Sequence, residues 1–232
     1  MSSSASRLQL KPIIIAISSG LLCLILSPYG IKVHTVEFQF HFLWSVALPI
    51  IVSLAYGGRY GLIAALSGAA WYPFLLWPQE GYTNLLYAAF LLWYFFGTGE
   101  LLSHIRSTSA ESSKKMMVYL SASILAFFTI AFLLLYKPLL SLNPPFWSNE
   151  SITNIPNNVL FAFTIKDTIN FIFIIVVSEL LLKLPTIRKL LGIGVSPMMQ
   201  NNMKVFIWAC VATLLMWFTF YGLDYLIVTK LK

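Results

Sequence analysis

Seven long apolar segments follow one another along this chain, and short polar loops separate most of them. Hydrophobic residues make up 59% of the 232 positions and charged residues only 10%, whereas soluble domains carry about 25% charged residues. The segments are continuous rather than alternating, and a bilayer core holds no water to satisfy free backbone groups. The sequence therefore predicts an all-α fold, a polytopic transmembrane helix bundle.

The length of each apolar segment sets the predicted spans, because a spanning helix needs roughly 17 to 25 residues. Seven spans put the C-terminus outside, where the basic residues Lys230 and Lys232 are unfavourable, so six spans are the alternative. In either case the whole chain forms a single integral membrane domain. The predicted spans are residues 12–26, 38–56, 61–77, 85–102, 116–136, 160–182 and 205–228.

Lys and Arg residues in short loops indicate orientation, because they favour the cytoplasmic side. A cytoplasmic N-terminus assigns ten basic residues to inner loops and four to outer ones, with Lys166 inside a span. This predicts a multi-pass protein of the cell membrane with its N-terminus inside. The net charge of +7 then reflects contact with anionic lipid, and no nucleic-acid partner is expected. The inner ten are Arg7, Lys11, Arg59, Arg106, Lys114, Lys115, Lys183, Arg188, Lys189 and Lys204.

A row of small residues opens the third predicted span. Gly57, Gly61, Ala65 and Ala69 recur every fourth position, and Gly68 lies beside them. Small residues at this spacing let another helix approach closely inside a membrane. The row predicts a tight helix contact within the chain, and the alternative is a docking surface for a partner subunit.

The sixth predicted span carries polar residues within an otherwise apolar helix: Thr164, Lys166, Asp167, Thr168 and Asn170. Charges inside a membrane usually face a bundle interior or a watery cavity. Because adjacent helical residues do not face each other, Lys166 and Asp167 are expected to point towards different helices. Depth in the membrane favours Glu37 or Asp224 as the partner of Lys166. The pattern predicts a ligand or ion site that opens outward, with a structural ion pair and a proton relay as alternatives.

The segment before the second span alternates polar and aromatic residues, with Glu37, Gln39 and His41 on one side. This period of two indicates an extended lead-in. In a helix, His34, Glu37 and His41 would instead share one face at a spacing typical of metal ligands. We expect a polar strip at the outer mouth of a cavity and no metal. The loop 137–158 is expected to fold as a cap, because its prolines disfavour a helix.

Residues 26–78 contain two ordered motifs separated by a span with Pro49, namely Leu26-Ser27-Pro28-Tyr29-Gly30-Ile31 and Tyr56-Gly57-Gly58-Arg59-Tyr60-Gly61. This arrangement resembles the membrane-embedded sensor regions of bacterial signalling proteins such as histidine kinases. It also resembles the substrate-binding components of energy-coupling-factor transporters. Both resemblances imply a bundle that binds a small molecule from outside, together with a partner subunit such as a kinase or an ATPase.

The predicted function is that of a non-enzymatic receptor or sensor with a polar pocket in its outer half. A transport subunit is the alternative, and an intramembrane enzyme acting on lipid is the third candidate. The chain contains no Walker loop, nucleophile elbow, HExxH or CxxC motif, so we predict no catalytic residue and no cofactor. The candidate ligand-binding residues are Glu37, His41, Trp71, Tyr72, Lys166, Asp167 and Asn170.

Overall fold

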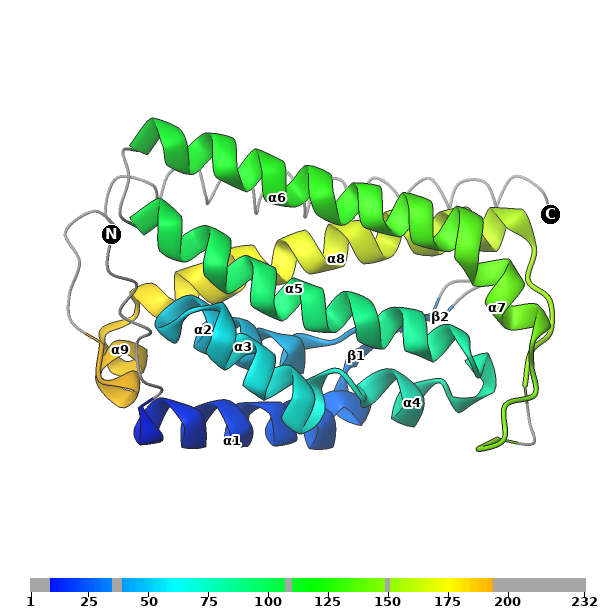
Figure 1. The fold of residues 1–232 in the computed structure, drawn as a ribbon, viewed down its shortest axis with the longest axis horizontal. Coiled ribbons are helices and arrows are strands. Elements are labelled where there is room, and N and C mark those ends of the chain that lie inside the picture. Colours follow the sequence, from blue (N-terminus) through cyan, green and yellow to red (C-terminus); the bar gives the residue numbers. More distant parts are fainter. Residues whose placement is uncertain (1–8, 35–38, 107–109, 149–150, 194–232) are drawn as a thin grey trace, which may run out of the picture.

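The computed structural model describes residues 9–34, 39–106, 110–148 and 151–193 (Figure 1). Apart from one two-stranded hairpin, the regular elements in these ranges are helical. The helices are α1 (Leu10–Leu26), α2 (Ala47–Tyr56), α3 (Gly58–Ala64), α4 (Tyr72–Leu76), α5 (Thr83–Arg106), α6 (Ala110–Ile130), α7 (Lys137–Ser141), α8 (Asn157–Lys183) and α9 (Pro185–Leu191). Short 3₁₀ turns are η1 (Ser27–Tyr29), η2 (Trp44–Val46) and η4 (Pro78–Glu80), and π-helical turns are η3 (Ala65–Ala69) and η5 (Ala131–Tyr136).

Three helices in the described part of the chain are long and apolar enough to cross a membrane. They run from Leu10 to Tyr29, from Tyr119 to Ser141 and from Val159 to Leu182. The second of them exposes Leu133 and Leu134 by 50% and 65%. Such an apolar surface suits contact with lipid tails. The predicted spans 12–26, 116–136 and 160–182 are therefore confirmed as helices that fit a membrane.

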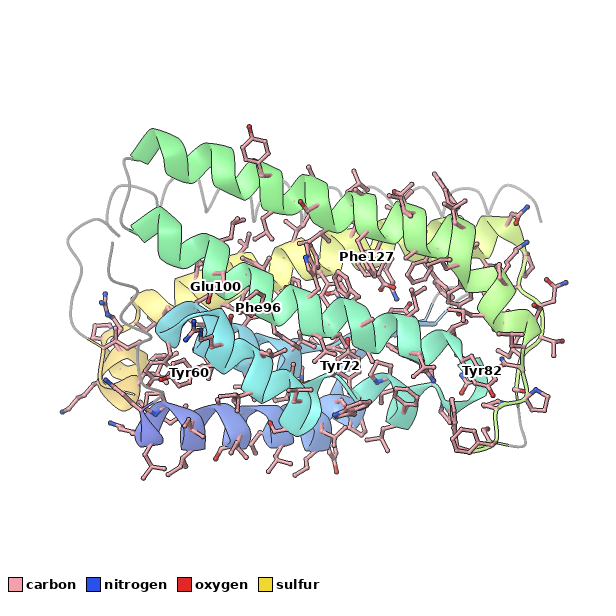
Figure 2. The ribbon with its side chains drawn as sticks, viewed as in Figure 1. Tyr60, Tyr72, Tyr82, Phe96, Glu100 and Phe127 are labelled. Carbon is pink, nitrogen blue, oxygen red and sulfur yellow. The ribbon has the colours of Figure 1, made fainter. Side chains whose placement is uncertain are left out.

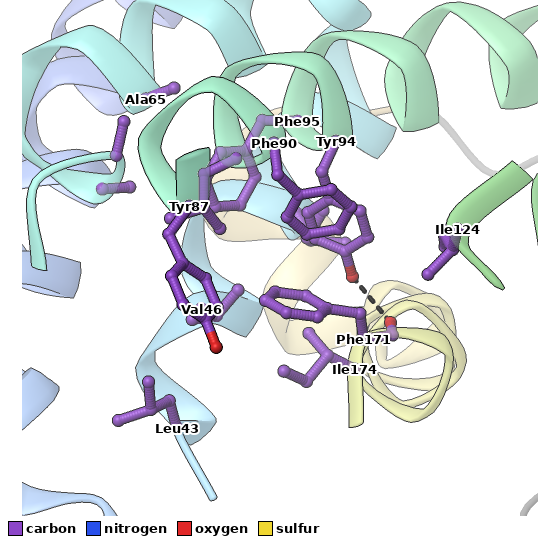
Figure 3. Close-up of a cluster of buried hydrophobic side chains, with 14 of the residues drawn as sticks. Leu43, Val46, Ala65, Tyr87, Phe90, Tyr94, Phe95, Ile124, Phe171 and Ile174 are labelled. Atoms are coloured by element: carbon purple, nitrogen blue, oxygen red, sulfur yellow. Dashed lines mark hydrogen bonds between the residues drawn. The ribbon is translucent and has the colours of Figure 1, made fainter. Parts of the chain in front are cut away.

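Helix α5 lies at the centre of the bundle and corresponds to the predicted span 85–102. It packs against α2, α3 and α6. Its side chains Phe90 and Tyr94 are fully buried. The Tyr94 hydroxyl donates a 2.7 Å hydrogen bond to the carbonyl of Phe171 in α8 (Figure 3). Because protein rather than lipid covers much of α5, this helix accommodates polar side chains that a lipid-facing helix would not.

The structure differs from the predicted span 38–56. Residues 39–42 form strand β2 (Gln39–Phe42), which pairs antiparallel with β1 (Ile31–His34), so that Ile31 lies opposite Phe42. The apolar helical stretch runs only from Trp44 to Tyr56. The extended lead-in predicted from the period-two pattern is thus confirmed for these strands, and a helix through residues 39–42 is wrong.

The predicted span 61–77 is not one helix but α3, η3 and α4 in succession. Gly68 leaves helical geometry with φ of 178° and ψ of −41°. Pro73 then stands in the first turn of α4, a position where its missing N–H removes no helical hydrogen bond. The chain bends at Gly68 because η3 lies directly on α1: a Cβ at Gly68 would meet the backbone of Gly20.

The small-residue row packs within the chain. A Cβ added at Gly61 would meet the carbonyl oxygen of Phe95 and the side chain of Ser53, and Ala65 and Ala69 are fully buried. Gly57 has a positive φ of 103° and ends α2 in a tight turn before α3. Helices α1 and α5 lie on either side of the row.

Basic residues gather at one end of the bundle. The start of α1 meets the start of α3 there, because Gln9 N donates to the Tyr60 hydroxyl, and Tyr56 at the end of α2 reaches the Leu191 carbonyl of α9 (Figure 1). The opposite end carries η4, α7 and the loop before α8. The described basic residues on elements at the first end are Lys11, Arg59, Arg106, Lys114, Lys115, Lys183, Arg188 and Lys189. The predicted span 205–228 lies outside the described residues.

Candidate functional site: a buried polar cluster

An ion pair lies inside the bundle on α8. Lys166 Nζ is 2.8 Å from Asp167 Oδ1, and Asp167 Oδ2 accepts a 2.9 Å hydrogen bond from the Tyr87 hydroxyl of α5. Asp167 is only 5% exposed. The expectation that the two charges find separate partners is wrong, because the flexible lysine stem lets the ammonium turn back to its neighbour. Asp167 nevertheless reaches a different helix through Tyr87, as expected. The expected partners Glu37 and Asp224 lie outside the described residues.

A second carboxyl group approaches this pair from η4. Burial raises the pKa of Glu80 to about 7, and the negative charge of Asp167 also raises it. Hydrogen bonds from the Tyr136 and Thr83 hydroxyls and the positive charge of Lys166 lower the same pKa, but by less. Glu80 Oε2 is buried and has no hydrogen-bond partner among the described residues. The carboxyl group is therefore poised to exchange a proton near neutral pH.

Asn84 joins Glu80 through a shared carbonyl group. The oxygen of Trp77 accepts hydrogen bonds from Asn84 Nδ2 at 2.9 Å and from the backbone N of Glu80 at 3.0 Å. The Asn84 side chain is fully buried, and its Oδ1 has no hydrogen-bond partner in the described ranges. We use the name polar cluster for Glu80, Asn84, Tyr87, Tyr136, Lys166 and Asp167.

The remaining polar residues of α8 differ in their bonding. The hydroxyl of Thr164 donates to the Leu160 carbonyl at 3.0 Å, and that of Thr168 donates to the Thr164 carbonyl at 2.8 Å. These bonds satisfy both threonines within the helix. Asn170 is different, because its buried Oδ1 has no partner within the part of the chain that the structure describes.

A loop folds over the cluster's end of the bundle, as predicted, but the expectation of no helix from residue 137 onward is wrong for α7 (Lys137–Ser141), whose Pro138 lies in the first helical turn. Asn143 accepts a hydrogen bond from Tyr82 N at 3.1 Å and donates to the carbonyls of Glu80 at 3.3 Å and Ile152 at 2.7 Å. Ile152 N in turn donates to the Gln79 carbonyl at 2.8 Å. Asn143 thus ties the cap to η4, the turn that carries Glu80.

The other candidate residues differ in how they relate to the cluster. Tyr72 is 1% exposed (Figure 2) and lies close enough to Asp167 for an electrostatic interaction. Its ring meets that of Trp77 edge to face at a centroid distance of 6.2 Å. Trp71 is 43% exposed, and its Nε1 donates to the Leu66 carbonyl, so it faces away from the cluster. His41 lies in β2, and Glu37 falls outside the described residues.

Glu80, Asn84, Tyr87 and Tyr136 were not among the residues predicted for the site. A sequence signal exists for Asn84 and Tyr87, which are three positions apart on α5, whereas Glu80 lies in η4 before Gly81, where the backbone is not helical. Within the described ranges no three His, Cys, Asp or Glu side chains are grouped to hold a metal ion.

Comparison with protein-family models, curated proteins and solved structures finds no match to this chain. Its class follows from the fold and the site alone. Three helices are long and apolar enough to cross a membrane, and two of them carry residues of the polar cluster, namely Tyr136, Lys166 and Asp167; these features fit a helical membrane protein.

Proposed function

We propose that this protein is a non-enzymatic membrane receptor or sensor that binds a small polar molecule at the capped end of its bundle. The ion pair of Lys166 and Asp167 carries the proposal, together with nearby oxygens of Glu80 and Asn84 that have no hydrogen-bond partner among the described residues. In proteins, buried polar atoms are almost always hydrogen-bonded. If the ion pair were purely structural, we would expect the buried oxygens of Glu80 and Asn84 to accept hydrogen bonds from the neighbouring described residues as well.

The orientation of the site follows from charge. Basic residues cluster at the end opposite to the cap, and such residues favour the cytoplasmic side. We therefore assign the capped end to the outside and the N-terminus to the cytoplasm. The full proposal has seven spans, and a reporter fused to the C-terminus distinguishes seven spans from six by its side of the membrane.

The transport alternative receives less support. A docking surface built from Gly61, Ala65 and Ala69 would need these residues to be accessible, yet they are buried against helices of the same chain. Any partner kinase or ATPase subunit would have to contact another surface. The basic end, which includes Arg188 and Lys189 of α9, is the surface that we assign to such a cytoplasmic partner.

The experiment is a thermal-stability screen of the full chain in lipid nanodiscs. The probes are lysine, glutamate, glucose and spermidine, each at millimolar concentration. We expect one probe to raise the melting temperature of the wild-type protein and to lose this effect in Lys166→Met. Lys189→Met, at the opposite end, is the matched control and keeps the effect. A probe that stabilises both variants equally would place the site elsewhere.

A further inference from the structure

The charges in the polar cluster do not balance among the described residues. Glu80 and Asp167 contribute two carboxyl groups, and Lys166 contributes one ammonium group. The hydroxyl groups of Tyr87 and Tyr136 are neutral. Lys137 follows Tyr136 but binds the Asn157 side chain in the cap. One negative charge therefore remains for a proton or another cation to neutralise.

The unpartnered atoms of the cluster are all of one chemical kind. Glu80 Oε2 and Asn84 Oδ1 are oxygens that accept hydrogen bonds or coordinate cations, and both are buried without a partner in the described ranges. Asn84 is independent of the acidic groups, since it is an uncharged side chain that is 0% exposed. Its amide group is held beside the backbone of Glu80, because Asn84 Nδ2 and Glu80 N both donate to the Trp77 carbonyl. The two unpartnered atoms are acceptors, so they favour a ligand that is a cation or a hydrogen-bond donor.

We propose that the polar cluster binds one singly charged cation, either an alkali ion or a primary ammonium group, in exchange for the proton on Glu80. This inference rests on the proposed function and names the charge of its ligand. Glu80 Oε2 and Asn84 Oδ1 supply the contacts, while Lys166 stays paired with Asp167. The exchange conserves charge: one cation enters, the Glu80 O–H bond breaks and one proton leaves to solvent.

The exchange predicts a defined pH dependence. Burial holds the pKa of Glu80 at about 7, so below that pH a cation must displace a bound proton. The apparent dissociation constant should then rise about tenfold for each pH unit below about 7 and level off above it. Lys166, Asp167, Tyr136 and Thr83 are the groups that face the carboxyl group from α8, η5 and the start of α5.

The test uses the full chain in nanodiscs with sodium chloride, potassium chloride or ethylammonium chloride as probes. Choline chloride keeps the ionic strength constant. It serves as the inert salt, because its quaternary nitrogen has no N–H donor. We expect one probe to raise the melting temperature more at pH 8.5 than at pH 5.5, and Glu80→Gln to remove this response. Glu100→Gln, the same substitution at the other end of α5, keeps it. In weak buffer at pH 6, the active probe should release about one proton per chain.

The two proposals fail in different ways. Stabilisation by glutamate or glucose, with no response to the three cations, overturns this inference and leaves the receptor function standing. A cation response that persists in Glu80→Gln, or that occurs without proton release at pH 6, also overturns it. If Glu80→Gln does not fold, proton release by the wild-type protein decides the question alone.

Discussion

Tyr87 on α5 and Asp167 on α8 are joined across 80 residues of sequence by a 2.9 Å hydrogen bond, in which the tyrosine hydroxyl donates to Oδ2. Both side chains are buried. Lys166 Nζ lies 2.8 Å from the other carboxylate oxygen, Oδ1. The hydrogen bond from Tyr87 therefore couples the central helix to the helix that carries the ion pair.

Replacing Tyr87 by Phe removes this bond and leaves Asp167 Oδ2 without its donor. Hydrogen bonds to charged groups contribute roughly 1.5 to 3 kcal/mol, so we expect the free energy of unfolding to fall by about 2 kcal/mol. Denaturant unfolding in detergent micelles measures the change. Tyr119→Phe, on the exposed face of α6, is the control, and an equal effect of both substitutions would contradict the prediction.

The ion pair should show strong non-additivity. Lys166→Met alone leaves the Asp167 carboxylate buried without its counter-ion, and breaking a buried pair costs roughly 3 to 5 kcal/mol. The double variant Lys166→Met, Asp167→Leu removes both charges and should lose less stability than Lys166→Met alone. A double-mutant cycle measures the coupling. Additive losses would show that the two charges do not interact.

Local pattern was enough to predict α1, α8 and the extended lead-in. The two helices follow from the length of a continuous apolar segment, and the lead-in follows from a period of two, so none of them depends on a contact with a distant part of the chain. The bend at Gly68 could not be predicted, because its cause is a contact with Gly20, 48 positions earlier. The same limit applies to the polar cluster. The sequence of α8 was enough to select Lys166 and Asp167 as candidates, whereas the hydrogen bond from Tyr87 depends on how α5 packs against α8.

Sequence spacing also misled the prediction for the ion pair. Adjacent positions point about 100° apart on a helix, which led to the expectation of two separate partners for Lys166 and Asp167. The rule applies to Cβ directions and short side chains. A lysine ammonium group lies several bonds from Cβ, and in a buried site with a carboxylate next to it the shortest path to a counter-ion is along its own helix.

Close packing between α1 and η3 should make Gly20 intolerant of any side chain. A Cβ at Gly20 would collide with the Ala64 carbonyl oxygen and with Ser67 Oγ. Because overpacking typically costs about 1 to 3 kcal/mol, Gly20→Ala should lower the melting temperature. Gly97→Ala is the matched control in another helix, since the nearest atom to its Cβ would be Trp93 Nε1 at 3.8 Å. Equal melting temperatures for the two variants would argue against the packed contact.

The cap should depend on Asn143, whose side chain holds η4 and the loop together through three hydrogen bonds. Asn143→Ala removes all three, and we expect faster amide hydrogen exchange at Tyr82 and Ile152, with exchange in α1 unchanged. Asn154→Ala, an exposed position in the same loop, should leave the exchange rates as in the wild type. Unchanged protection in Asn143→Ala would mean that the cap is held by other contacts.

The free energy of unfolding should decrease as pH rises from about 4.5 to about 7, because Glu80 keeps its proton longer in the folded protein. Burial raises the pKa of Glu80 from 4.5 to about 7. Between these values the folded state binds more protons than the unfolded state, so stability falls with pH and levels off above about 7. At 1.36 kcal/mol per pKa unit, the free energy of unfolding falls by about 3 kcal/mol in total.

Melting temperatures in choline buffer, which contains no competing small cation, measure this pH profile. Glu80→Gln should flatten it and Glu100→Gln should preserve it, whereas parallel profiles for the wild type and Glu80→Gln would assign the titration to another group.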